Sequence, residues 1–226
     1  MPETETLCFD MYGTLCDTSS VTGTLAAELD ASDALVSRID ETWRAKQLQY
    51  SYQSALMDDY QPFWEVTTDA LDYALAQWGV DADDATRATI LDSYNHLDPY
   101  PDAIDTLTRL SAAGHTVTVL SNGNPDMLET LAANAGLAPH LDDVISADEV
   151  STFKPNPAVY ENAAARTDTP IEQCRLVSGN AWDVAGAGNA GMATAWVDRA
   201  NDPFERIGVE PSLAVTSLAD VADELA

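Results

Sequence analysis

Short apolar runs and longer amphipathic stretches alternate along much of the chain. The runs are four or five residues long, or three at their shortest, and several are rich in β-branched residues, which is typical of buried strands. The sequence predicts strands at residues 6–10, 116–120, 143–146, 175–177, 194–197 and 213–215. Helical segments separate the later runs, and strands that alternate with helices predict a parallel sheet covered on both faces.

The segment between residues 17 and 97 has a different pattern. Apolar residues recur at helical spacing, as Leu35, Ile39 and Trp43 show, and no run resembles a strand. Helices are predicted at residues 34–53, 61–78 and 85–94, the second ending at Gly79. We therefore expect an all-helical cap domain (17–97) inserted into a core domain made of residues 1–16 and 98–226.

The rest of the chain predicts a doubly wound, Rossmann-like α/β core. A helix over 102–113 ends at Gly114, and Pro125 suits the first turn of a helix that ends near Gly136. Parallel sheets of this kind bind ligands at the carboxyl ends of their strands, where the winding reverses. Polar residues that follow the predicted strands are therefore the first candidates for chemistry.

The charge of the chain is strongly unbalanced. Of 226 residues, 38 are acidic and 10 are basic, which gives a formal net charge of -28. Nucleic acids and anionic membrane surfaces need a cationic partner, so we expect neither. The acidic residues are scattered between apolar stretches, which favours adaptation to high salt, where self-repulsion is screened. A surface that docks basic proteins is the alternative.

Cysteine usage and the start of the chain predict a cytoplasmic protein. The 3 cysteines are widely spaced with no CxxC pair, so neither a disulfide framework nor a zinc site is expected. The first residues are acidic and polar where a secretory signal would be basic and then apolar. No apolar run approaches the ~18 residues that span a bilayer.

Reactive side chains follow several of the predicted strands. Each group by itself is also common in turns and helix caps. Together and in this order they form a specific pattern: Asp10 with Thr14, Ser121-Asn122-Gly123, Lys154-Pro155, and Ser178-Gly179-Asn180 with Asp183.

This order resembles the haloacid dehalogenase superfamily over the whole chain. Its nucleophile motif matches Asp10-Met-Tyr-Gly-Thr-Leu15, and its second motif matches Leu120-Ser-Asn-Gly123. Its lysine matches Phe153-Lys-Pro155, and its fourth motif matches Ser178-Gly-Asn-Ala-Trp-Asp183. Most members are magnesium-dependent phosphatases, with a second aspartate two residues after the nucleophile.

Two positions depart from the phosphatase pattern. Tyr12 stands where the second aspartate would be, and Asn180 is neutral where a carboxylate would serve magnesium. With Trp182, these residues make the chain similar to the L-2-haloacid dehalogenase (type II) branch. The resemblance also covers the helical cap, whose arginine matches Arg44, and the tyrosine at Tyr160. It implies no metal and no other cofactor.

The resemblance implies hydrolysis of short L-2-haloalkanoic acids to 2-hydroxy acids, with inversion. In the implied mechanism, Asp10 attacks C2, and a water molecule activated by Asp183 then hydrolyses the ester. A homodimer is also expected. The implied catalytic residues are Asp10, Thr14, Arg44, Lys154, Ser178, Asn180 and Asp183. The implied substrate-binding residues are Met11, Tyr12, Arg44, Phe63, Ser121, Asn122, Tyr160 and Trp182, with Met11 and Gly179 standing where other residues are common.

Several alternatives remain at this stage. A magnesium phosphatase, a hydrolase with the same nucleophile and another leaving group, and a non-catalytic binding module are the other functions. Arg44 has a structural explanation as a surface ion pair with Glu41, and Asp183 as an acid favoured at a helix N-terminus. Phe63 has a structural explanation as part of the hydrophobic core of the cap.

Overall fold

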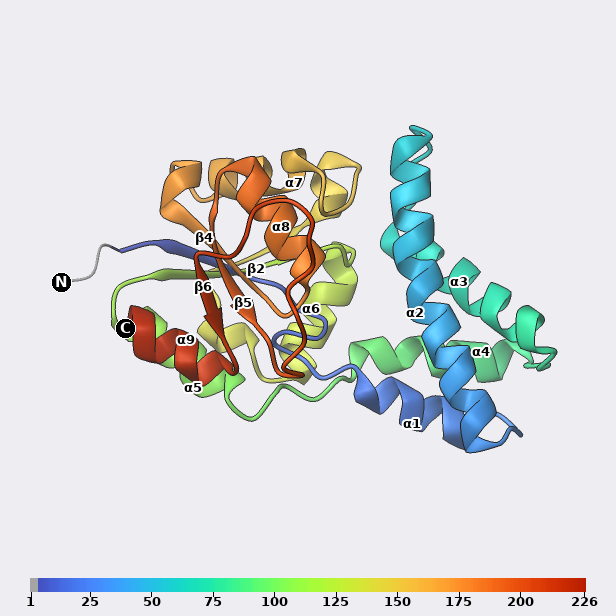
Figure 1. Ribbon diagram of the computed structural model, residues 1–226. Helices are drawn as coiled ribbons and strands as arrows, with labels where there is room; N and C mark the ends of the chain where they lie inside the picture. The colour runs from blue at the N-terminus through green and yellow to red at the C-terminus, as the bar shows by residue number, and fades with distance from the viewer. Residues whose placement is uncertain (1–3) are drawn as a thin grey trace.

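The computed structural model describes residues 4–226. The predicted core domain begins at residue 1, and the prediction of no secretory signal rests on the first residues of the chain. Residues 1–3 lie outside the described part. Within it, six parallel strands form one sheet in the order β3-β2-β1-β4-β5-β6 (Figure 1). The strands are β1 (Thr6–Phe9), β2 (Thr116–Ser121), β3 (Asp143–Ser146), β4 (Cys174–Ser178), β5 (Ala193–Val197) and β6 (Leu213–Val215). The predicted strands and the doubly wound fold are confirmed.

Alternate residues of the central strands enter two different hydrophobic clusters. Leu7 and Phe9 of β1 belong to one cluster, and Cys8 between them belongs to the other. This follows from the two-residue period of a strand, which sends successive side chains to opposite faces. Helices must therefore cover both faces of the sheet.

Two groups of helices supply that cover. Helices α7 (Pro157–Arg166) and α8 (Ala181–Ala190) pack on the face that carries Cys8. Helices α5 (Ala103–Ala112), α6 (Pro125–Asn134) and α9 (Leu218–Leu225) contribute buried leucines and valines to the other cluster. Short 3₁₀ turns, η2 (Ala138–His140), η3 (Ala147–Val150) and η4 (Ile171–Gln173), connect these elements.

The segment between β1 and α5 is helical throughout its regular elements. It contains α1 (Ser19–Glu28), α2 (Asp33–Leu56), α3 (Phe63–Trp78), α4 (Asp84–Asp92) and the 3₁₀ turn η1 (Ser93–Asn95). These helices lie to one side of the sheet, beyond the end where α6 begins (Figure 1). We call residues 17–97 the helical insert; its behaviour as a separate domain stays a prediction.

Helices α2, α3 and α4 confirm the three helices predicted in the insert, whereas α1 was not predicted. Its sequence, SSVTGTLAAE, contains glycine, two threonines and a valine, all of which lower helix propensity. Val21 and Leu25 are buried against the rest of the insert, so tertiary packing stabilises this helix where local preference does not.

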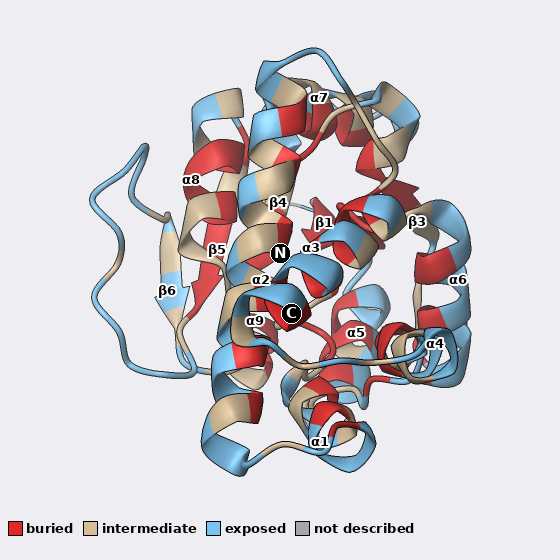
Figure 2. Cartoon of the chain, turned by 90° about the vertical axis from the view of Figure 1, so that its right-hand side faces the viewer, coloured by how far each residue is buried: buried red, intermediate tan, exposed pale blue. Residues whose placement is uncertain are grey.

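Buried residues concentrate on the strands and on the inward faces of the helices (Figure 2). The loop between β5 and β6 is mostly exposed and projects from the molecule in the same view. No helix among residues 4–226 is both long and apolar enough to cross a membrane.

Candidate active site

The site lies where the winding of the sheet reverses. β1 pairs with β2 on one side and with β4 on the other, so the chain leaves these neighbouring strands at the same edge. Asp10 follows β1 directly, Ser121 ends β2, and Ser178 ends β4 with Asn180 two residues later. The topology thus gathers residues that are far apart in the sequence.

Three donors hold the carboxylate of Asp10. Lys154 Nζ donates to Oδ1 at 2.9 Å, and Thr14 Oγ1 and Asn180 Nδ2 both donate to Oδ2 at 2.9 Å. Only 5% of the Asp10 residue surface is exposed. The carboxylate is therefore fixed in one orientation and largely withdrawn from water, and Oδ1 has a single hydrogen-bond partner among residues 4–226.

Two glycines shape the loops around Asp10: Gly13 in the loop after β1 and Gly179 directly after β4. Gly13 has φ +78°, a left-handed conformation that suits glycine, and its amide closes the turn on the carbonyl of Cys16. Gly179 donates its amide to Thr14 Oγ1 at 2.9 Å, and a Cβ there would lie 2.9 Å from the carbonyl oxygen of Gly13. The glycine at position 179 thus allows the two loops to touch behind Asp10.

Lys154 is shared between two carboxylates. Its Nζ donates to Asp10 and, at 2.7 Å, to Asp183 Oδ2, and the lysine side chain is 1% exposed. Burial disfavours the ammonium ion, but the charges of Asp10 and Asp183 outweigh it and raise the pKa of Lys154. Lys154 is therefore a permanent cation beside Asp10.

Asp183 lies behind Lys154. Its Oδ1 accepts from the Tyr160 hydroxyl at 2.7 Å, its Oδ2 accepts from Lys154, and its surface is fully buried. Burial raises the pKa of Asp183; the charge of Lys154 opposes this shift and that of Asp10 adds to it. Burial and the neighbouring charge of Asp183 hold the pKa of Tyr160 well above its usual value, so its hydroxyl remains a donor.

A cavity of about 280 Å³ opens above Asp10 between the sheet and the helical insert. The predicted site residues that line it are Asp10, Tyr12, Arg44, Phe63, Ser121, Asn122, Lys154, Asn180 and Trp182. Gly13, Thr18, Gln47, Leu48 and Tyr94 line it as well and were not predicted.

Five predicted residues do not line this cavity. Thr14 and Asp183 contact the lining residues Asp10 and Lys154, Tyr160 contacts Asp183, and Ser178 Oγ accepts from the amide of Asn180 at 3.1 Å. Met11 was predicted to bind substrate, but its side chain is fully buried in the core, where its sulfur accepts from Cys16 Sγ at 3.7 Å. The structure does not bring the Met11 side chain to the cavity.

Two donors point to the cavity without complete protein partners. Arg44 Nε donates to Asp40 at 2.9 Å and Nη2 to the carbonyl of Thr18 at 2.7 Å, while Nη1 donates to nothing among residues 4–226. The ion pair is thus with Asp40, one turn earlier on α2, and the pairing with Glu41 was wrong. Asn122 Oδ1 accepts from the amide of Lys154 at 2.8 Å, which leaves Nδ2 directed away from that bond.

Gln47 carried a signal that sequence reasoning missed. It lies three residues after Arg44 on α2, a spacing that places both on one face of a helix. Its side chain bonds Thr67 Oγ1 and accepts from Tyr94, which fixes it within the insert. Tyr94 gave no such signal, because it lies in a short 3₁₀ turn brought to the cavity by the packing of the insert.

The donor set is poorly suited to magnesium. Among residues 4–226 no cluster of three or more His, Cys, Asp or Glu side chains could hold a metal. The two carboxylates of the site, Asp10 and Asp183, are bridged by the ammonium of Lys154, so an ion that bridged them would have to displace a buried cation.

Comparisons with known proteins agree with this geometry. The profile of the haloacid dehalogenase-like hydrolases matches residues 4–191. The chain is 41% identical over 198 residues to (S)-2-haloacid dehalogenase 1 of Pseudomonas sp. (strain CBS-3), covering 87% of this chain and 86% of the relative. It is 35% identical over 225 residues to an (S)-2-haloacid dehalogenase of Pseudomonas putida, covering 100% and 98%.

A solved structure gives the same result. The L-2-haloacid dehalogenase of Xanthobacter autotrophicus with chloropropionic acid covalently bound superposes with a TM-score of 0.88 at 35% identity, covering 98% of each chain. Fold, strand-end residues and sequence relatives agree. The chain therefore belongs to the haloacid dehalogenase superfamily, and within it to the L-2-haloacid dehalogenase family.

Proposed function

We propose that this protein hydrolyses short L-2-haloalkanoic acids to 2-hydroxy acids with inversion at C2, through an ester on Asp10. One observation carries the proposal: a buried carboxylate, held by Lys154, Thr14 and Asn180, faces a small cavity that offers unpaired donors opposite it. The names of the relatives, and the covalently bound chloropropionic acid in one of them, support the same reaction.

In the first step, an oxygen of Asp10 forms a bond to C2 as the carbon–halogen bond breaks, and the halide leaves with the bonding electrons. Within the described part of the chain, Lys154 is the one hydrogen-bond partner of Asp10 Oδ1, and this is the oxygen we assign to the attack. Orienting both reactants in a dry cavity supplies much of the barrier lowering, on the order of 7–11 kcal/mol for well-aligned groups.

The substrate brings a second negative charge next to Asp10. Lys154 and Arg44 are the cations that line the cavity, and they offset that charge. Ser121 and the amides of the loop after Asp10 are assigned to the substrate carboxylate, and Tyr12, Phe63 and Trp182 to its alkyl group. Arg44 and Asn122 donate to the departing halide, where charge develops.

In the second step, water attacks the Asp10 carbonyl carbon, the alkoxide leaves, and a proton from the water reaches it to give the alcohol. We assign the base to Asp183, supported by Ser178 and Asn180. Once Asp10 is esterified, it no longer carries the charge that raises the pKa of Asp183, so ionised Asp183 is favoured in this intermediate. Water must displace Asp183 from one of its present partners to reach it.

Halide release from the two enantiomers of 2-chloropropionate, measured in EDTA, tests the proposal. We expect chloride only from the L-enantiomer and D-lactate as product. Phosphate release from a generic phosphomonoester with magnesium, and no chloride release, would instead identify a phosphatase. In a single turnover with excess enzyme in ¹⁸O-water, the first alcohol should be unlabelled, since its oxygen comes from Asp10.

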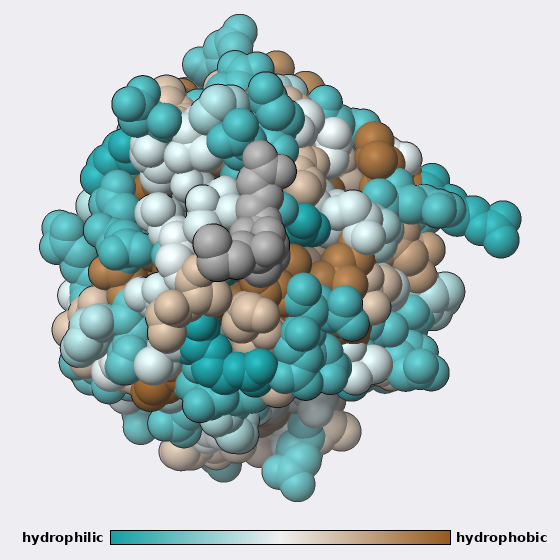
Figure 3. Space-filling view, turned by 90° about the vertical axis from the view of Figure 1, so that its left-hand side faces the viewer, coloured by the Kyte–Doolittle hydropathy of each residue, from teal (hydrophilic) through white to brown (hydrophobic). Residues whose placement is uncertain are grey.

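We also propose that the acidic surface is an adaptation to high salt in a cytoplasmic enzyme. The acidic residues behind the net charge of -28 are scattered along the sequence, and hydrophilic residues cover much of the face shown in Figure 3. We expect the melting temperature to fall markedly when KCl is removed, because screening of the self-repulsion is lost. A melting temperature independent of KCl would instead favour the alternative, a surface that docks basic proteins.

The homodimer stays a prediction, and light scattering in high KCl tests it.

A further inference from the structure

Asn124 has an unusual arrangement for a residue at the start of a helix. It directly precedes Pro125, the first residue of α6, where an asparagine side chain ordinarily accepts from an amide of its own helix. Here it makes no such bond to α6. Its two polar atoms are engaged elsewhere.

Asn124 caps a helix of the insert instead. Its Oδ1 accepts from the backbone amide of Trp64 at 2.7 Å, in the first turn of α3. The residue that precedes α3 is Pro62, whose side chain makes no cap bond. A side chain on the sheet side therefore satisfies an amide that would otherwise lack a partner within its helix.

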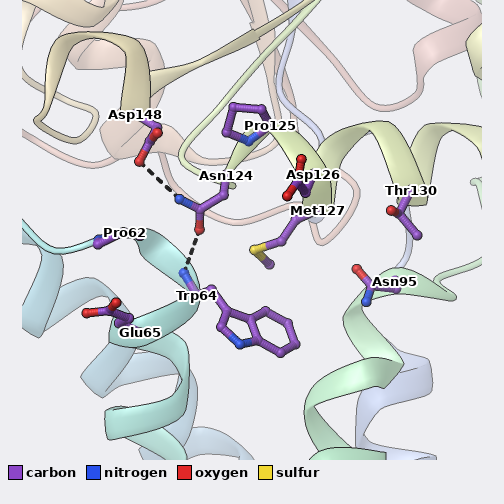
Figure 4. Close-up of a pocket in the computed structure, with 10 residues that line it drawn as sticks. All are labelled: Pro62, Trp64, Glu65, Asn95, Asn124, Pro125, Asp126, Met127, Thr130 and Asp148. Carbon is purple, nitrogen blue, oxygen red and sulfur yellow. Dashed lines mark hydrogen bonds between the residues drawn. The ribbon is translucent and has the colours of Figure 1, made fainter.

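A second side chain fixes the orientation of the Asn124 amide. Asn124 Nδ2 donates to Asp148 Oδ1 at 3.0 Å, and the Tyr60 hydroxyl donates to the same oxygen at 2.5 Å. Figure 4 shows Asn124 between Asp148 and Trp64, along the wall of a larger cavity of about 560 Å³. We call Tyr60, Trp64, Asn124 and Asp148 the junction, since two of its bonds join the insert to the sheet side.

The junction lies next to Phe63, which forms part of the wall of the active-site cavity. Phe63 lies next to Trp64, lines that cavity and is 8% exposed. Its ring is 6.1 Å from that of Phe153, and the Tyr60 ring is 5.1 Å from the same Phe153, which precedes Lys154. Fixing Tyr60 and the Trp64 amide therefore fixes Phe63 from both sides.

We propose that Asn124 is a positioning residue for the reaction: by capping α3 from the sheet side, it holds Phe63 in the cavity and limits the size of the substrate. The inference rests on the proposed dehalogenation. Asn124 acts through Phe63 and does not itself line the active-site cavity.

The first test is Asn124→Ala, with L-2-chloropropionate and the longer L-2-chlorohexanoate as substrates. We expect KM for chloropropionate to rise about tenfold with kcat changed less than about threefold, since a lost cap and a looser wall weaken binding. The ratio of kcat/KM for L-2-chloropropionate to kcat/KM for L-2-chlorohexanoate should fall by at least about threefold.

Asp83→Ala is the matched control. Asp83 caps α4 of the insert by accepting from the amide of Thr86 at 2.8 Å, and it lines neither the active-site cavity nor the cavity beside the junction. It should lower the melting temperature to a similar extent and leave both KM and substrate preference unchanged. Equal kinetic effects in the two variants would overturn the proposal.

A swap of side chains tests the junction directly. Asn124→Asp places two carboxylates together and should weaken KM at least as much as Asn124→Ala. The double variant Asn124→Asp, Asp148→Asn restores an acceptor for Trp64, a donor between the pair and an acceptor for Tyr60, so it should recover most of the loss. A double variant that is as impaired as the sum of its singles would contradict the role.

Hydrogen exchange separates this inference from the proposed function, because it needs no substrate. The peptide that contains Trp64 should exchange faster in Asn124→Ala and not in Asp83→Ala. Unchanged protection would overturn the capping role even where halide release is normal. Absence of halide release by the wild-type protein would overturn the dehalogenation, and with it the limit on substrate size, but not the capping of α3 by Asn124.

Discussion

On the sheet side of the cavity, each reactive group is held by buried partners, whereas on the insert side the key cation is about one-third exposed. Lys154 is 1% exposed and bridges two carboxylates. The Arg44 side chain is 30% exposed, with one ion pair and one carbonyl as partners. The sheet side thus fixes the charges that the chemistry needs, and the insert side offers donors that are still available to a ligand.

This difference predicts that loss of the buried cation Lys154 on the sheet side changes stability and activity together, while loss of Arg44 on the insert side changes activity alone. A buried charge that loses its partner is costly, whereas an exposed ion pair contributes little to folding.

The largest effect is expected for Asp10→Asn. The amide is nearly the same size as the carboxylate but is a far weaker nucleophile, so halide release should fall by roughly 10⁴-fold or more. Circular dichroism should show an intact fold. Activity near that of the wild type would remove Asp10 as the nucleophile.

Lys154→Met should remove activity and also destabilise the protein by about 3–5 kcal/mol, because Asp10 and Asp183 are left buried without a cation. Without Lys154, the folded-state pKa of Asp183 rises further above its unfolded value. The folded state then binds protons more tightly than the unfolded one, so the variant should regain stability as the pH falls from 8 to 5. Urea unfolding across that range measures this.

Lys46→Met is the control for this variant, since it makes the same change in charge at a lysine that packs on Tyr73 at the surface of the insert. It should cost less than about 1 kcal/mol with no such pH dependence. Equal losses in the two variants would show that burial of Lys154 is not decisive.

Asp183→Asn should separate the two steps of the reaction. The asparagine oxygen can still accept from Tyr160, but the base is lost, so the ester on Asp10 should accumulate. Intact-protein mass spectrometry after incubation with L-2-chloropropionate should show one adduct. Loss of turnover with no adduct would count against Asp183 in the second step.

Arg44→Ala tests the insert side. Loss of a donor to the departing halide should lower kcat/KM by on the order of 10²-fold, while the free energy of unfolding changes by less than about 1 kcal/mol. Arg38→Ala is the matched control on the same helix, where Arg38 lies 5.4 Å from the Trp78 ring. A stability loss in Arg44→Ala comparable with that of Lys154→Met would break the comparison.

The smallest effect concerns the cysteines of the sheet side, which a reagent resembling the substrate could alkylate. Burial raises the pKa of Cys8 and Cys16 to about 12 and that of Cys174 to about 11. At pH 8 only on the order of 10⁻³ of Cys174 is thiolate. Iodoacetate at pH 8 should label none of the three in the native protein and all three in urea, which peptide mapping can check.

Much of the fold and of the candidate site could be predicted from the sequence. Strand periodicity and the order of polar residues after the strands placed Asp10, Ser121 and Asn180 at one edge, because parallel strands bring their carboxyl ends together, whereas the resemblance to a known family placed Lys154 beside Asp10. The helix α1 escaped because its composition opposes a helix, and its stability comes from the burial of Val21 and Leu25.

The sequence by itself determined the sheet, the helical nature of the insert and the residues that gather at the strand ends, since these follow from periodicity and chain topology. Only the tertiary structure decided which side chains reach the cavity. It turned Met11 into the core, placed Asp183 behind Lys154 and gave Asn124 to a helix other than its own. The direction of a side chain depends on partners distant in the chain, which no local pattern encodes.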